Sequence, residues 1–119
     1  MLNFSLPIAP SANNAFFNRK DGKGYGRIKS SAYRRWVQQA DAYYTLQKLG
    51  KLAPIIVPYS TRMVFPSGLR SDLDGRAKLI LDWMVNRNLT PDDKFQRKLI
   101  LETDTDHPGA LVWITVKPC

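Results

Sequence analysis

The stretch from Leu73 to Asn86 places the strongest constraint on how this chain can fold, because its apolar residues recur every three or four positions. That period puts them on one face of an α-helix, and such a face has to be buried against another element. Asp72 stands where a helix N-cap belongs, so we predict a helix that begins there and ends near Asn86. Its apolar stripe comprises Leu73, Ala77, Ile80, Leu81, Met84 and Val85.

Around this helix the sequence alternates between strand and helix patterns. A second helix is predicted from Ser30 or Ser31 to about Leu49, where Gly50 follows as a natural stop. Strand patterns cover residues 3–8, 55–65, 98–102 and 110–116, whereas 11–29 has no period and is expected to be a long loop. The order β-α-β-α-β-β predicts an α+β fold in which two helices pack on one small mixed sheet.

Length and composition limit the class of protein. With 119 residues, 44% of them apolar and 24% charged, residues 1–119 are expected to form a single domain. No apolar run approaches the roughly 20 residues that a membrane-spanning helix needs, and the N-terminus lacks the pattern of a signal peptide. The single cysteine, Cys119, fits a reducing compartment. We therefore expect a cytoplasmic protein that does not enter a membrane.

The charge balance points to a polyanionic partner. The chain has 18 Lys and Arg residues against 10 Asp and Glu residues, a net charge of +8. Much of the excess lies before residue 40, where Phe16, Phe17, Tyr25 and Tyr33 are interleaved with basic residues. These aromatic residues either stack on nucleic-acid bases or pack inward from a solvated basic loop. The basic residues of the stretch are Arg19, Lys20, Lys23, Arg27, Lys29, Arg34 and Arg35.

Against this basic background, five of the ten acidic residues fall between positions 72 and 93. Asp74, Lys78 and Asp82 are spaced four residues apart, so they share one side of the predicted helix. Asp72 lies just before the helix or at its first residue, close enough to Asp74 for both carboxylates to reach one ion. A strand that returns alongside the helix would bring one residue of the pair Asp92–Asp93 to the same place.

Carboxylate oxygens are the ligands that Mg²⁺ prefers, and Asp72, Asp74 and Asp93 would supply them, with Mn²⁺ as a possible substitute. A metal at such a site activates water and neutralises charge on a phosphoryl group, and Lys78 would orient the water or stabilise that charge. The pattern predicts a metal-dependent nuclease. Each part also has a simpler interpretation. Asp72 suits a helix cap, Asp74 and Asp82 suit surface ion pairs with Lys78 worth at most about 0.5 kcal/mol each, and Asp92–Asp93 suits a turn after Pro91.

Several segments together resemble a known family. They are Asp72-Leu-Asp74-x-x-x-Lys78, followed by Asp82 and by Asp92–Asp93, the opening Leu6-Pro-Ile-Ala-Pro-Ser-Ala-Asn-Asn14, and the later Ser30-Ser-Ala-Tyr33-Arg34. In these features the chain is similar, over nearly its whole length, to the RusA family of Holliday-junction resolvases. Proteins of this family are typically bacterial, prophage or phage proteins.

The resemblance implies a Mg²⁺-dependent homodimeric endonuclease that resolves four-way DNA junctions by paired symmetric cuts in recombination and repair. By motif, Asp72, Asp74 and Asp93 match the metal-binding acids and Lys78 matches the catalytic lysine. A dimer suits a two-fold symmetric junction, because it supplies two active sites at a fixed separation. The expected DNA contacts are Asn13, Asn14, Arg19, Lys20, Lys23, Arg27, Lys29, Arg70 and Arg76.

Two positions depart from the family pattern. Gly75 stands where the family often has asparagine, and the approach to Asp92–Asp93 is Asn88-Leu-Thr-Pro91 where a glycine and a large aromatic residue are common. The second departure leaves open whether Asp92 or Asp93 is the third metal ligand. Two alternative functions remain: a nuclease for other branched DNA, and a branched-DNA-binding protein without catalytic activity.

Overall fold

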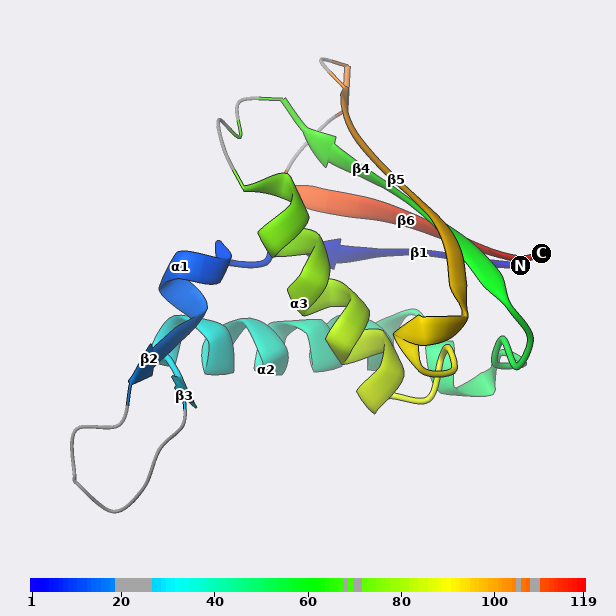
Figure 1. Ribbon diagram of the computed structural model, residues 1–119, viewed down its shortest axis with the longest axis horizontal. Helices are drawn as coiled ribbons and strands as arrows, with labels where there is room; N and C mark the ends of the chain where they lie inside the picture. The colour runs from blue at the N-terminus through cyan, green and yellow to red at the C-terminus, as the bar shows by residue number, and fades with distance from the viewer. Residues whose placement is uncertain (19–26, 68, 70–71, 105, 108–109) are drawn as a thin grey trace.

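The computed structural model describes residues 1–18, 27–67, 69, 72–104, 106–107 and 110–119. Its main sheet consists of β1 (Leu2–Pro7), β4 (Tyr59–Pro66), β5 (Gln96–Asp104) and β6 (Leu111–Pro118), in the order β1-β6-β4-β5. Strand β4 runs parallel to β5 and antiparallel to β6, which pairs antiparallel with β1. The sheet is therefore mixed, and the predicted α+β class is confirmed (Figure 1).

Two helices, α2 (Ser31–Leu46) and α3 (Leu73–Asn86), cover one face of this sheet (Figure 1). Alternate strand residues point into the core because successive side chains of a strand face opposite sides. Trp83 of α3 packs against both Phe4 of β1 and Trp36 of α2, and the Trp36 indole N–H donates to the Pro7 carbonyl at 2.9 Å. The buried residues of the main sheet are Leu2, Phe4, Leu6, Tyr59, Thr61, Met63, Phe65, Pro66, Val112, Ile114 and Val116.

Asp41 joins α2 to the end of α3. Its carboxylate accepts bonds from Arg87 Nε at 2.7 Å, Arg87 Nη2 at 2.6 Å and Trp83 Nε1 at 3.0 Å. The two Arg87 bonds form a bidentate pair, the strongest common geometry for a carboxylate and a guanidinium. Helix α3 is thus held at a defined position against α2, and its outer face carries the predicted acidic residues.

The segment 11–29 is not the unstructured loop that the lack of period predicted. It contains helix α1 (Ala12–Ala15) and strand β2 (Phe16–Asn18), which pairs antiparallel with β3 (Arg27–Lys29). Residues 19–26 lie outside the described part. Elements this short bury few side chains and leave little periodicity, but the backbone bond from Ser30 N–H to the Ala15 carbonyl, 2.8 Å, fixes where the segment enters α2.

Other boundaries also differ from the prediction. Helix α2 ends at Leu46, because Lys48 adopts a left-handed φ of 56° and the short 3₁₀ helix η1 (Leu49–Lys51) follows. Strand β4 begins at Tyr59, immediately after Pro58, which cannot donate a ladder bond. Strand β5 begins earlier than predicted, directly after the 3₁₀ helix η2 (Asp93–Phe95). Within the described residues, no helix is long and apolar enough to span a membrane.

Candidate active site on helix α3

On the outer side of α3, Lys78 lies between the carboxylates of Asp82 and Asp93, and we call these residues the acidic group. Its ammonium nitrogen lies 3.3 Å from Asp82 Oδ1, one turn further along the helix, and 3.4 Å from Asp93 Oδ2 in η2. Asp93 is fifteen residues from Lys78 in sequence, so the chain leaving α3 returns to the same face. The structure confirms the prediction that the segment after the helix brings an acid alongside it.

The charges of this group act on one another. The carboxylate of Asp82, followed by hydrogen bonds to Asp82 and Asp93, raises the pKa of Lys78, so its ammonium stays protonated at neutral pH. The backbone N–H of Lys94 donates to Asp92 Oδ1 at 3.1 Å and lowers the pKa of that carboxyl. Asp92 therefore caps η2, while its neighbour Asp93 turns toward Lys78.

Asp72 precedes α3 in a left-handed conformation, with φ of 63°, and its side chain makes no capping hydrogen bond to the helix. Asp72 thus occupies the predicted N-cap position, where its carbonyl accepts the Arg76 N–H at 3.0 Å, but its side chain does not cap the helix. Its carboxylate lies over Gly75, where a Cβ atom would be 2.3 Å from Oδ1 and 2.5 Å from Oδ2. Only a residue without a side chain leaves this space, so Gly75 allows the observed position of Asp72.

Asp74 lies exposed in the first turn of α3. It is one turn, about 6 Å along the axis, before Lys78, whereas Asp93 lies beside Lys78 itself. In the described part of the chain, no three acidic, histidine or cysteine side chains are grouped closely enough to hold a metal ion. Asp72, Asp74 and Asp93 offer the oxygen donors that suit Mg²⁺, with Lys78 positioned between the helix start and Asp82.

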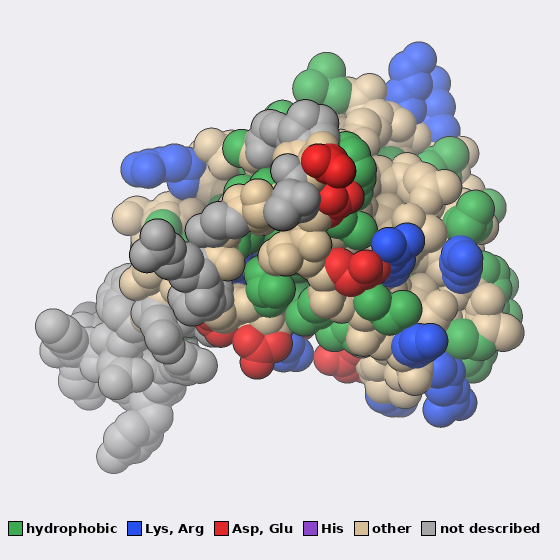
Figure 2. All heavy atoms as spheres, turned by 90° about the horizontal axis from the view of Figure 1, so that it is seen from above, with side chains coloured by type: hydrophobic (Ala, Val, Ile, Leu, Met, Phe, Trp, Pro, Cys, Tyr) green, Lys and Arg blue, Asp and Glu red, His purple; other side chains and the backbone are tan. Residues whose placement is uncertain are grey.

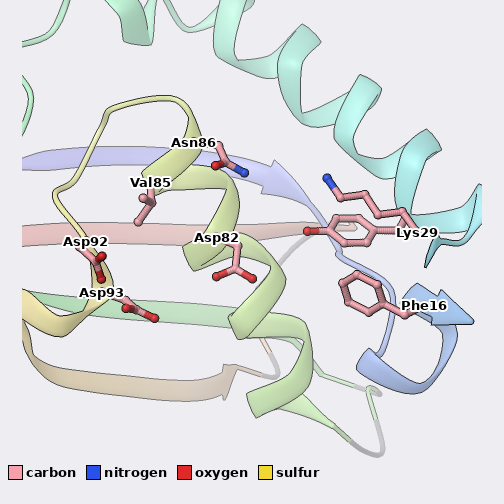
Figure 3. Close-up of a pocket in the computed structure, with 8 residues that line it drawn as sticks. Phe16, Lys29, Asp82, Val85, Asn86, Asp92 and Asp93 are labelled. Carbon is pink, nitrogen blue, oxygen red and sulfur yellow. The ribbon is translucent and has the colours of Figure 1, made fainter. Parts of the chain in front are cut away.

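A cavity of about 340 Å³ opens next to this group. Figure 3 shows Phe16 and Lys29, from the β2–β3 pair, on one side and Asp82 and Asn86, from α3, on the other. Asp92 and Asp93 close one end. The remaining lining residues are Tyr33 and Val85.

Tyr33 forms the inner part of the aromatic wall and is only 4% exposed. Phe16 packs edge-on against its ring with centroids 5.2 Å apart, and Lys29 Nζ lies 5.1 Å from the Tyr33 ring centroid. Burial, followed by the charge of Asp82, raises the pKa of the Tyr33 hydroxyl. The aromatic residues of the basic segment were expected either to stack on nucleic-acid bases or to pack inward. Tyr33 packs inward, and it also borders the cavity.

The predicted DNA contacts lie in several places. Lys29 is exposed at the cavity, and Asn14 is exposed in α1. Arg76 instead donates from Nη1 to the Ala9 carbonyl at 2.7 Å and is partly buried, so it anchors the chain between β1 and α1. The side chains of Asn13 and Arg27, and all of Arg19, Lys20, Lys23 and Arg70, lie outside the described residues.

The sequence interpretation missed the cavity and Asn86, because nothing in the local pattern shows that α3 faces the β2–β3 pair. The alternation of aromatic and basic residues before α2 was the one available signal. Figure 2 shows acidic side chains across the middle of one face, with basic side chains beside them and toward its rim. The acidic group is therefore a local exception on a molecule with net charge +8.

No model of a known protein family matches the chain, and a search of the curated proteins finds no match either.

Proposed function

We propose that this protein is a metal-dependent endonuclease that cuts branched DNA, with four-way junctions as the substrate that its resemblance to the RusA family implies. One observation carries the proposal: Asp93 and Lys78 meet on the same outer side of α3 that carries Asp74. Acids gathered on one face of a basic protein are costly unless a cation offsets them, and a phosphate-bound divalent metal is such a cation.

In this proposal Asp72, Asp74 and Asp93 hold Mg²⁺ or Mn²⁺. The metal would activate water and offset charge on the phosphoryl group. The Lys78 ammonium, kept protonated by Asp82 and Asp93, would stabilise negative charge that develops on the phosphate oxygens. Gly75 leaves room for the Asp72 carboxylate beside the start of α3. A homodimer would present two such sites for paired cuts.

A second candidate is a branched-DNA-binding protein without catalytic activity. It is favoured by the pairing of Lys78 with both Asp82 and Asp93, which offsets these acids without a metal. The lack of a three-acid group among the described residues favours it as well. In that case the basic surface would bind DNA and the acids would only position Lys78.

Incubation with a labelled synthetic four-way junction distinguishes the two. We expect paired symmetric nicks in Mg²⁺, none in EDTA, and little cleavage of linear duplex. Asp74→Asn should abolish cutting while it keeps or tightens junction binding, because it removes a charge that repels phosphate. Normal cutting by Asp74→Asn would refute the assigned site, and tight binding without cutting in either Mg²⁺ or Mn²⁺ would establish the second candidate.

A further inference from the structure

The cavity beside Lys78 has two chemically different walls. One is formed by the aromatic rings of Phe16 and Tyr33 with Lys29 at its edge, and the other by polar side chains of α3 and the segment after it (Figure 3). Its volume of about 340 Å³ lies at the small end of the range of roughly 300–1,000 Å³ for small-molecule sites. A single aromatic ring system fits such a space.

The polar wall selects for hydrogen-bond donors. Ionised carboxylates only accept hydrogen bonds, whereas the amide of Asn86 both donates and accepts. Lys78 engages Oδ1 of Asp82 and Oδ2 of Asp93, so the second oxygen of each carboxylate lies outside that ion pair. The three carboxylates of this wall therefore favour a ligand that presents N–H groups to them.

The same acids exclude a phosphate from the interior. Asp82, Asp92 and Asp93 all line the cavity, and their negative charges repel a phosphate group. Among the described residues that line the cavity, Lys29 is the only basic one, and it is exposed. A nucleotide would therefore enter with its uncharged base between the two walls and its phosphate toward Lys29.

We propose that this cavity binds the base of one unpaired nucleotide, and that it prefers a base with an exocyclic amino group (adenine, cytosine or guanine) over thymine. The amino group would donate to a carboxylate, as carboxylates accept from the cytosine amine in other protein–DNA contacts. Thymine lacks such an amino group, and its one ring N–H on that edge lies between two carbonyl oxygens, which the acids would repel. Stacking beside Phe16 would add binding energy that does not depend on sequence.

This inference rests on the proposed function and makes its substrate more specific. A base within a duplex is stacked and paired, so it reaches a side pocket only when it is unpaired or extruded. The site on α3 would therefore act on DNA that exposes an unpaired nucleotide beside the reacting phosphate, as branch points do more readily than linear duplex.

Fluorescence anisotropy with short single strands of equal length, dA, dC and dT, tests the pocket in EDTA, where cleavage is not involved. Phosphate contacts depend on salt but are the same for all three strands, so the ratio of affinities isolates the base. We expect dA and dC to bind roughly tenfold more tightly than dT. Asp82→Asn, which replaces an acceptor oxygen of the polar wall by a donor, should reduce this ratio, and Phe16→Leu should weaken all three strands alike. Gln39→Ala, which removes an exposed amide from α2, should change neither quantity.

A strand with one 2-aminopurine gives an independent readout, because stacking beside an aromatic ring quenches its fluorescence. We expect the fluorescence of 2-aminopurine to be quenched when the strand binds the wild type, and to be quenched less when it binds Phe16→Leu. A thermal unfolding transition of Phe16→Leu serves as the control that this variant is folded. Equal affinities of the wild type for the three strands, or a ratio that is unchanged in Asp82→Asn, would overturn the pocket. Selective binding without junction cutting would refute the endonuclease alone, and cutting without selectivity would refute the pocket alone.

Discussion

Gly75 offers the most direct test of how the start of α3 is built. A Cβ at this position would lie 2.3 Å from Asp72 Oδ1, 2.5 Å from Oδ2 and 2.6 Å from Cγ, whereas ordinary contacts begin at 3.4 Å. The difference, 3.4 − 2.3, requires a shift of about 1.1 Å. All three atoms belong to one flexible side chain, so Gly75→Ala should displace the Asp72 carboxylate and leave the helix intact.

The effects of Gly75→Ala on stability and on activity should differ. Replacing a helical glycine by alanine stabilises a helix by up to about 1 kcal/mol, and moving Asp72 off its rotamer costs about 0.5–1.5 kcal/mol. We therefore expect the free energy of unfolding to change by less than about 1 kcal/mol in urea titrations. A displacement near 1 Å in a catalytic group lowers rates by about 100-fold, so junction cleavage should fall by that order.

Gly50→Ala is the matched control. A Cβ at Gly50 would also meet a side chain, since Tyr44 Oη would lie 2.8 Å away. Gly50 lies in η1, however, and the atoms nearest to this Cβ belong to Tyr44 and not to an acidic residue of the site. Its cleavage rate should stay at the wild-type value. Titration of Mg²⁺ by calorimetry should also show weaker binding to Gly75→Ala than to Gly50→Ala. If Gly75→Ala cuts and binds metal like the wild type, the position of the Asp72 carboxylate has no functional role.

Three further outcomes are expected. Asp41→Asn should lower the free energy of unfolding by about 1 kcal/mol at neutral pH, since it weakens partly exposed bonds to Arg87 and Trp83. The Arg87 bond lowers the Asp41 pKa, so this stabilisation is present above the unfolded pKa near 3.9 and is lost as pH falls through the lowered folded value. Urea titrations should show the difference in stability between wild type and variant disappear over that pH range, and a difference that stays constant would contradict the role of the charge. Lys78→Ala should change stability by less than about 0.5 kcal/mol, because its ion pairs are exposed, yet reduce single-turnover cleavage more than junction affinity; an equal loss in both would make Lys78 a binding residue. Neutralising Arg19, Lys20 and Lys23 should weaken junction binding and make its affinity less dependent on salt concentration. An unchanged salt dependence would mean that these three residues make no phosphate contacts.

The local sequence already contained the main elements of the fold. The period of apolar residues from Leu73 to Val85 predicted α3 almost to the residue, because one face of a surface helix must meet the core. Ser30 or Ser31 was predicted to begin α2, and the structure has Ser30 as the cap, where its side chain accepts the Tyr33 N–H. Short paired elements such as β2 and β3 escaped prediction, since three residues are too few to show a period.

The acidic residues were equally visible in the sequence, but their partners were not. The four-residue spacing of Lys78 and Asp82 sufficed to predict their contact, because a helix repeats every 3.6 residues. That Asp93 rather than Asp92 approaches Lys78 depends on how η2 turns the chain into β5. The meeting of Phe16 and Lys29 with α3 across a cavity depends on three separate elements. Local spacing determines which side chains share a helix face, whereas contacts between elements arise only when the buried faces of those elements pack together.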